Sequence, residues 1–260
     1  MVTPESPNIV TIRMEFLDKK EFSFKPGQFV LVSVFGQGEI VLGLSSSSYQ
    51  KDYIEVSVNK LGRVSQALHR TNVDDILGIR GPYGNHFNIE EYKGKEIVLI
   101  GGGCGISPLR SLLFDLLENK KDFKNITLLF GARSVVDLPF KENCREWEKS
   151  VEAVYTVDPG GETSDWKHKV GFIPTVLEEM KLKPKKKLII TCGPPIMIKF
   201  VNEALEKAKF TPDQIITTLE MKMKCGIGKC GRCNVGEIYL CKDGPIFTYA
   251  EIKEFFSNEF

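Results

Sequence analysis

The stretch Ile97-Val-Leu-Ile-Gly101-Gly-Gly-Cys-Gly-Ile-Ser-Pro108 decides the fold of the second half of this chain. Its continuous apolar run is typical of a strand buried on both faces of a sheet, and leucines at helical spacing follow over residues 108–118. Glycines at such a junction let the backbone approach a pyrophosphate at the helix N-terminus. The strict G-x-G-x-x-G pattern is absent because Pro108 stands where it would continue. A plain strand–helix turn is the alternative, but it does not need three consecutive glycines followed by Gly105.

Strands and helices continue to alternate after this stretch. Strands are predicted at residues 126–130, 153–157, 188–191 and 215–219, and helices at residues 144–149, 173–180 and 197–209. This order predicts a doubly wound, mostly parallel α/β domain. A second cluster, Cys192-Gly-Pro-Pro195, follows one of the strands, at the sheet edge where ligands bind. A cysteine at such a position is more often a small buried residue than a reactive one.

Before residue 95 the pattern is different. Short alternating runs at residues 9–16, 22–24, 29–34, 53–58 and 76–79 are separated by Gly and Pro. They predict an antiparallel β-barrel or sandwich, interrupted by one helix near residues 64–70. We therefore expect three regions: a β-barrel domain at 1–94, an α/β nucleotide-binding domain at 95–212, and a small C-terminal cysteine-rich loop domain at 213–260.

Four cysteines of the last region form the pattern C-x4-C-x2-C-x7-C: Cys225, Cys230, Cys233 and Cys241. The first three match the plant-type spacing of thiolates that hold a 2Fe–2S cluster. Glycines at 226, 228 and 231 supply the backbone freedom that a loop around such a cluster needs. Zinc is the alternative, although zinc ribbons usually show two C-x2-C knuckles and this segment has one. A disulfide framework is a weaker alternative.

Composition and net charge indicate the class of partner and the cellular compartment. The chain has 260 residues, 42% hydrophobic and 27% charged, with a net charge of +1. Such a small charge argues against a nucleic-acid partner or an anionic membrane surface. No apolar stretch of membrane-spanning length and no signal peptide is evident, so we expect no direct membrane insertion. Seven cysteines, an odd number, favour the reducing cytoplasm.

The motif order resembles the ferredoxin–NADP reductase superfamily over essentially the whole chain. Arg80-Gly-Pro-Tyr-Gly-Asn85 and Met223-Lys-Cys225-Gly-Ile-Gly-Lys-Cys230-Gly narrow the resemblance. They are similar to the branch with a C-terminal 2Fe–2S cluster, which holds sulfhydrogenase gamma subunits, the FAD/NAD-binding subunit of anaerobic sulfite reductase and the electron-transfer subunit of dihydroorotate dehydrogenase. The resemblance implies FAD in the barrel domain, NAD(P)H in the α/β domain and a 2Fe–2S cluster on the four cysteines.

The family's flavin motif, Arg-x-Tyr-Ser, falls on Ile40-Val-Leu42-Gly43 and departs from it, because the charge, the aromatic ring and the hydroxyl are missing. Backbone groups would replace those contacts. The FAD contacts that the resemblance implies are Leu42, Gly43, Leu44, Ser45, Val58, Asn59, Gly62, Arg63, Val64 and Ser65. Of these, Ser65, Arg63 and the N-terminus of the helix would hold the FAD diphosphate. For Gly62 and Ser65, an ordinary turn with a helix cap is the alternative.

The resemblance also implies a set of nicotinamide nucleotide contacts: Gly102, Gly103, Gly105, Ile106, Pro108, Gly131, Ala132, Arg133, Asp158, Gly193, Pro194, Pro195 and Met197. Cys192 would flank the nicotinamide and is the candidate catalytic residue.

No constellation of acid, base and nucleophile is apparent in the sequence. The predicted function is therefore that of a diaphorase subunit, which moves electrons between NAD(P)H, FAD and a 2Fe–2S cluster. Its partner would be another redox subunit, such as a hydrogenase or a sulfite reductase. One alternative is the electron-transfer subunit of dihydroorotate dehydrogenase. The other is a non-catalytic nucleotide-binding module with a structural zinc site.

Overall fold

The structure, a computed structural model, describes residues 1–253. These residues form two compact units. The first unit contains Met1–Phe87, Ser107–Asp115 and Leu219–Pro245, and the second contains Asn88–Ile106, Leu116–Thr218 and the segment that starts at Ile246. Residues 254–260, the end of the predicted 213–260 region, lie outside the described residues. No helix in the described part of the chain is long and apolar enough to cross a membrane.

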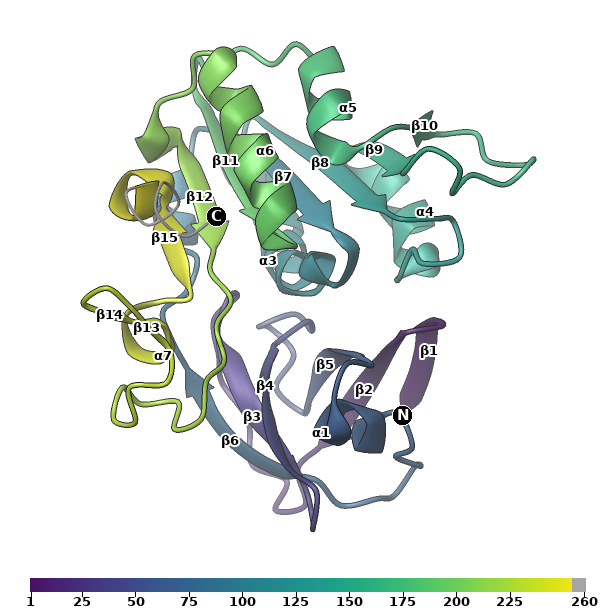
Figure 1. Cartoon of the computed structure of the whole chain (residues 1–260), viewed down its shortest axis with the longest axis vertical. Coiled ribbons are helices and arrows are strands. Elements are labelled where there is room, and N and C mark those ends of the chain that lie inside the picture. Colours follow the sequence, from purple (N-terminus) through teal and green to yellow (C-terminus); the bar gives the residue numbers. More distant parts are fainter. Residues whose placement is uncertain (254–260) are drawn as a thin grey trace. The chain divides into compact units, whose positions relative to one another are not determined.

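The first unit is built on two antiparallel sheets (Figure 1). One has the strand order β1 (Val2–Ser6), β2 (Ile9–Glu15), β5 (Tyr53–Asn59), and the other has the order β4 (Gly38–Gly43), β3 (Phe29–Val34), β6 (Gly78–Tyr83). A bridge between Leu44 and Val56 joins the residue after β4 to β5. Apolar side chains from both sheets, such as Ile12 and Val30, fill one core. The predicted antiparallel barrel is therefore confirmed.

Local differences from the predicted strands have simple causes. Residues 22–24 do not form the expected strand. Their apolar side chains pack instead: the rings of Phe16 and Phe22 stack with centroids 5.1 Å apart, and Phe24 is buried in the barrel core. The predicted helix near residues 64–70 is α1 (Arg63–Leu68). Both β1 and β4 lie outside the predicted strands, because each contains residues that the sequence pattern assigns to turns or termini.

The C-terminal part of the first unit has little regular structure. It contains a short hairpin, β13 (Asn234–Val235) and β14 (Ile238–Tyr239), and the helical turn α7 (Leu240–Asp243). Cys241 belongs to α7, and the other three cysteines of the motif lie in the loops before the hairpin.

The second unit is built on one sheet with the order β10-β9-β8-β7-β11-β12-β15. Its strands are β7 (Glu96–Gly102), β8 (Asn125–Ala132), β9 (Glu152–Val157), β10 (Lys169–Val170), β11 (Lys187–Cys192), β12 (Ile215–Thr218) and β15 (Ile246–Thr248). The pairs are parallel except β12 with β15. The run from Ile97 to Ile100 is fully buried in the sheet's centre, as its apolar sequence predicts.

Helices cover this sheet on both sides. They include α4 (Lys141–Ser150), α5 (Ile173–Glu179) and α6 (Pro195–Lys207). The chain also has the helix α2 (Ile89–Tyr92) and the short 3-10 turns η1 (Gly103–Gly105), η2 (Lys120–Asp122) and η3 (Pro212–Gln214), and most of α3 (Ile106–Glu118) belongs to the first unit. Figure 1 shows α5 and α6 in front of the sheet and α4 behind it. The strand order runs from β7 through β8 and β9 to β10 and resumes at β11 on the other side of β7. The doubly wound prediction is confirmed, and the order reverses between β7 and β11.

Candidate cofactor sites

The two glycine clusters predicted for the nucleotide meet at this reversal point. Gly102 ends β7, and Cys192 ends the neighbouring strand β11. A Cβ at Gly105 would lie 2.5 Å from the Cys192 carbonyl oxygen, and one at Gly193 would lie 2.6 Å from Met197 Cε. A Cβ at Gly102 would also collide with Met197. These glycines are therefore needed for the close packing of the two loops, whatever else they do.

Gly103 differs from its neighbours. It has a φ of +53°, which side-chain-bearing residues rarely adopt, and nothing lies within 4 Å of the position of a Cβ. It is part of the turn η1, which leads directly into α3. A backbone open to space before a helix N-terminus fits a pyrophosphate. Contact of the nucleotide with Gly102, Gly103, Gly105, Ile106 and Pro108 stays a prediction.

The loops after β8 and β9 are held together by backbone contacts. Asp158 donates its N–H to the Ala132 carbonyl at 3.1 Å, and Val135 donates to the Gly161 carbonyl at 2.9 Å. Partial burial raises the pKa of Asp158, and the charge of Arg133 opposes that shift. The structure thus brings together Arg133 and Asp158, which the sequence places on different strands. Their contact with the nicotinamide nucleotide stays a prediction.

Gly131 has a packing explanation. A Cβ at this position would lie 2.7 Å from Ile173 Cγ1 and 2.8 Å from Thr156 Cγ2. Because Ile173 begins α5, Gly131 lets this helix approach the end of β8. The glycine is therefore required by the fold, and its predicted nucleotide contact is not needed to explain it.

Cys192 is a buried thiol. Its residue is 2% exposed, and its sulfur accepts a hydrogen bond of 3.1 Å from the hydroxyl of Thr218, which is also buried. Thr218 ends β12, the neighbour of β11, so adjacent strands hold the two groups together. This environment favours a packing role over contact with a nicotinamide, and the catalytic assignment stays a prediction.

Three of the residues predicted for FAD are fully buried. Leu44, Ser45 and Val58 are 0% exposed, and Leu44 and Val58 belong to the barrel core, so their contact with FAD stays a prediction. Ser45 donates its N–H to the Glu55 carbonyl at 2.8 Å, while its buried hydroxyl has no partner among the described residues. Pro108, predicted for the nucleotide, lies beside Gly43, where a Cβ would be 3.2 Å from Pro108 Cγ.

The residues predicted for the FAD diphosphate are engaged within the protein. The Ser65 hydroxyl accepts hydrogen bonds from the N–H groups of Leu61 and Gly62, at 3.0 and 2.8 Å. The Arg63 guanidinium donates to the Gln37 side chain at 3.1 Å and to the Gly36 carbonyl at 3.0 Å. The turn and cap interpretation of Gly62 and Ser65 thus describes their contacts here. A diphosphate would have to compete with these bonds, and its binding at this turn stays a prediction.

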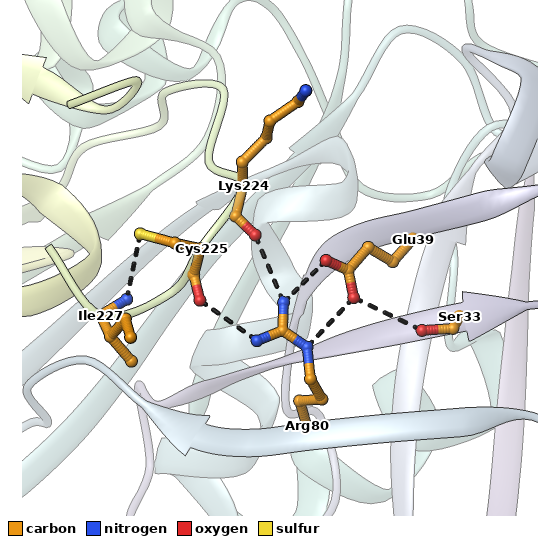
Figure 2. A network of polar contacts seen from close by, with 6 residues as sticks. All are labelled: Ser33, Glu39, Arg80, Lys224, Cys225 and Ile227. Carbon is orange, nitrogen blue, oxygen red and sulfur yellow. Dashed lines mark hydrogen bonds and ion pairs between the residues drawn. The ribbon is translucent and has the colours of Figure 1, made fainter. Parts of the chain in front are cut away.

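The cysteine loop has the features of a thiolate site. The Cys225 sulfur accepts backbone hydrogen bonds from Ile227 at 3.5 Å and Lys229 at 3.3 Å, and the Cys241 sulfur accepts one from Gly228 at 3.0 Å. Figure 2 shows the Ile227 nitrogen directed at the Cys225 sulfur. Such donors stabilise negative charge on sulfur. They lower the pKa of Cys225 to about 6, with the N–H of Ile227 contributing most.

The remaining cysteines lie beside these two. Burial raises the pKa of Cys241 to about 12, and the neighbouring thiols of Cys233 and Cys225 add to the shift. The glycines between the ligands have the expected left-handed backbone, with φ of +79°, +71° and +71° at 226, 228 and 231. Within residues 1–253, no three His, Cys, Asp or Glu side chains are arranged to hold a single metal ion. The donor set and its N–H partners nevertheless fit an iron–sulfur cluster, and the four ligands stay a prediction.

Sequence reasoning assigned no role to the contacts of Arg80–Asn85. The structure places Arg80 against the backbone of Cys225 and Asn85 against that of Asp243. The motif Arg80-Gly-Pro-Tyr-Gly-Asn85 marks these residues in the sequence, but nothing in the motif indicates that they contact the cysteine segment.

Three protein-family models match the chain in succession. Residues 2–88 match an oxidoreductase FAD-binding domain, residues 99–203 an oxidoreductase NAD-binding domain, and residues 220–253 the iron–sulfur cluster binding domain of dihydroorotate dehydrogenase B. The chain therefore contains domains of the FAD-binding, NAD-binding and iron–sulfur types.

Whole-chain relatives agree with this order. The chain is 39% identical to sulfhydrogenase 1 subunit gamma of Pyrococcus furiosus, over 90% of this chain and 82% of the relative. It is 34% identical to a probable electron-transfer subunit of dihydroorotate dehydrogenase B from Methanocaldococcus jannaschii, over 100% and 90%.

Solved structures share the fold. An NADH-dependent reduced ferredoxin–NADP oxidoreductase matches with a TM-score of 0.79 at 22% identity, over 96% of this chain and 87% of the other. A ferredoxin NADP+ reductase from Neisseria gonorrhoeae matches with a TM-score of 0.68 at 22% identity, over 83% and 94%.

Proposed function

The chain belongs to the family of electron-transfer subunits that includes the sulfhydrogenase gamma subunits and the electron-transfer subunits of dihydroorotate dehydrogenase B, and from this premise we propose how it works. It exchanges electrons between NAD(P)H and a partner redox subunit, through FAD and a 2Fe–2S cluster. The observation that carries this proposal is the succession of FAD-binding, NAD-binding and iron–sulfur domains along one chain. We propose the boundaries 1–94, 95–212 and 213–260 for these three domains.

When bound, NAD(P)H supplies electrons in pairs, FAD separates the pair, and the cluster carries one electron at a time. The residues of the chain bind and orient these groups. Gly103 presents an open backbone for the pyrophosphate, and Arg133 and Asp158 border the ribose. The backbone N–H groups of Ile227 and Lys229 favour the thiolate form of Cys225, and the N–H of Gly228 opposes the rise in pKa that burial causes at Cys241.

The partner we favour is a redox subunit of the hydrogenase or sulfite reductase type, because a sulfhydrogenase gamma subunit is 39% identical to this chain. The second candidate is a dihydroorotate dehydrogenase partner. It is supported by the model of the cluster domain over residues 220–253. The neighbouring genes would distinguish the two partners, because genes for hydrogenase or sulfite reductase subunits differ from genes of pyrimidine synthesis.

We also propose a cytoplasmic location. The odd number of cysteines, seven, and the use of four of them as proposed thiolate ligands support a reducing compartment.

Anaerobic reconstitution with iron, sulfide and FAD tests the cofactors. We expect flavin absorbance together with the EPR signal of a reduced 2Fe–2S cluster, and about two irons per chain. A colourless protein that holds one zinc ion would overturn the proposal in favour of the structural zinc site.

A single substitution tests the path of transfer. Cys233→Ala should keep reduction of the flavin by NADH but lose transfer to a protein acceptor, because the cluster would no longer assemble. Cys144→Ala is the matched control, since Cys144 lies on α4, outside the motif. Transfer that survives in Cys233→Ala would show that the cluster is not on the path.

A further inference from the structure

We propose that Arg80 is a positioning residue of the cluster. Paired with Glu39, it fixes the backbone at the first cysteine of the loop, and its charge raises the cluster's reduction potential. This inference rests on the proposed 2Fe–2S cluster. It assigns a role to the Arg80–Asn85 motif, which the function described above leaves unexplained.

The guanidinium of Arg80 donates hydrogen bonds to three residues (Figure 2). Its Nε and Nη2 atoms donate to the two carboxylate oxygens of Glu39, at 3.2 and 2.7 Å. Its Nη1 donates to the Cys225 carbonyl at 3.2 Å, and Nη2 also donates to the Lys224 carbonyl at 3.3 Å. The arginine thus joins an anchored carboxylate to two consecutive peptide groups at the start of the cysteine loop.

The barrel sheet determines this arrangement. Arg80 lies on β6 and Glu39 on β4, and β3 lies between these two strands. The Ser33 hydroxyl of β3 donates to Glu39 at 3.4 Å, which further fixes the carboxylate. Because an arginine–carboxylate pair with two parallel hydrogen bonds is planar, it orients the remaining N–H groups. Those N–H groups are directed at the loop.

The rest of the motif contacts the cysteine segment at two other places. A Cβ at Gly226 would lie 2.9 Å from both Leu31 Cδ1 and Tyr83 Cδ2, so the loop rests directly on β3 and β6. Asn85 donates its side-chain amide to the Asp243 carbonyl at 3.1 Å and its N–H to the Gly244 carbonyl at 2.7 Å. The motif therefore holds the segment on both sides of the predicted ligands.

The charge of Arg80 has a definite consequence. Reduction adds one negative charge to a cluster, and a nearby positive charge stabilises that state. Arg80 is next to the peptide of the ligand Cys225, and its hydrogen bonds turn two carbonyl oxygens toward the guanidinium. Glu39 partly cancels the positive charge. Removing the charge of Arg80 should therefore lower the reduction potential, and removing the charge of Glu39 should raise it.

The experiment compares variants of the reconstituted full chain by iron content, by EPR of the reduced cluster and by anaerobic redox titration. We expect Arg80→Gln to lower the midpoint potential and to broaden the EPR signal, because the loop loses its anchor. Glu39→Gln should raise the potential. Arg80→Lys should keep the potential near that of the wild type, because it keeps the charge, while its EPR signal still broadens.

Arg145→Gln is the matched control, because it removes the same charge from an exposed position on α4 and should leave the potential unchanged. Shifts of the same sign in Arg80→Gln and Glu39→Gln, or no shift in either, would overturn the inference. If Arg80→Gln fails to hold iron, the potentials of the other two variants still test the inference, because Glu39→Gln should have a raised potential and Arg80→Lys a potential near that of the wild type. A wild-type chain without the 2Fe–2S signal would instead overturn the proposed function.

Discussion

Gly105 and Cys192 are in direct backbone contact: a Cβ at Gly105 would lie 2.5 Å from the Cys192 carbonyl oxygen and 2.6 Å from the Cα of Gly193. The contact joins the loops that follow β7 and β11, two adjacent parallel strands. It occurs where the strand order reverses, which is where ligands bind in open α/β sheets. Gly102, Gly105 and Gly193 therefore allow the two loops to pack closely, while Gly103 leaves space beside its backbone.

Gly105→Ala should lower the free energy of unfolding by about 1–3 kcal/mol, because the added methyl group overpacks a backbone that has no room to move. Denaturation in urea measures this change. Gly160→Ala is a control with a positive φ of +88° and open space around the Cβ. The free energy of unfolding of this control should fall only by the cost of placing alanine in the left-handed backbone conformation, about 1–2 kcal/mol. NADH affinity should fall in Gly105→Ala alone.

Gly103→Ala should weaken NADH binding without overpacking the protein. The site of a new Cβ is open, so stability should fall only by the backbone cost of about 1–2 kcal/mol. The affinity for NADH should fall, because the methyl group would occupy the space proposed for the pyrophosphate. Fluorescence titration with NADH measures this affinity. Binding as tight as in the wild type would place the pyrophosphate elsewhere.

Cys192→Ala should leave NADH-dependent reduction of the flavin nearly unchanged. The thiol is buried and bonded to Thr218, so its removal should cost about 1 kcal/mol of stability through a small cavity. Stopped-flow kinetics at saturating NADH provides the test. A reduction rate lowered by more than about tenfold, corresponding to about 1.4 kcal/mol, would support the catalytic assignment instead.

Glu55→Gln should be strongly destabilising. Arg110 donates to Glu55 at 2.7 Å and to the Ser45 carbonyl at 2.8 Å, and both charged side chains are 11% exposed. Breaking a buried pair leaves an uncompensated charge, at a cost of about 3–5 kcal/mol. Glu179→Gln removes an exposed pair with Lys169 and should cost less than about 1 kcal/mol. Equal losses in thermal or urea denaturation would contradict this ranking.

The stability of the wild type should decrease between pH 7.5 and pH 5.5 more than that of His86→Gln. Partial burial, and then the charge of Lys25, lower the pKa of His86 below 6.5 in the folded state. Its contribution is therefore present above pH 6.5 and is lost as the pH falls through the folded pKa, because the unfolded chain binds the proton more readily. The Lys25 ammonium lies 3.3 Å from His86 Nε2. If the folded and unfolded states instead bound the proton equally, urea denaturation would give the same dependence of stability on pH for the wild type and for His86→Gln.

Several features follow from local sequence alone. The strand at Ile97–Ile100 and the helix after it are predicted from apolar periodicity, because that pattern directly reports which faces are buried. The same holds for α1 and for β2. The cysteine spacing likewise predicts the cluster type, because ligand chemistry depends on how few residues separate the thiols.

Other features depend on partners that are distant in sequence. The apolar residues at 22–24 resemble a strand, but Phe22 stacks on Phe16 instead. The short β15 is a strand because β12 pairs with it, since three residues carry too little pattern to indicate one. The flavin contacts are hard to predict for the same reason: Leu44 and Val58 are apolar and fully buried, and nothing in their local pattern indicates a cofactor.

The sequence by itself determined the order of the domains, the strand–helix alternation and the chemistry of the cysteine loop, because these depend on neighbouring residues. Only the tertiary structure decided that the Cys192 thiol is bonded to Thr218, and that Arg80 contacts Cys225 across 145 residues of chain. The first contact exists because β11 and β12 are adjacent in a sheet, and the second because the cysteine loop lies against β6. Periodicity within one segment carries no information about which segment will lie beside it.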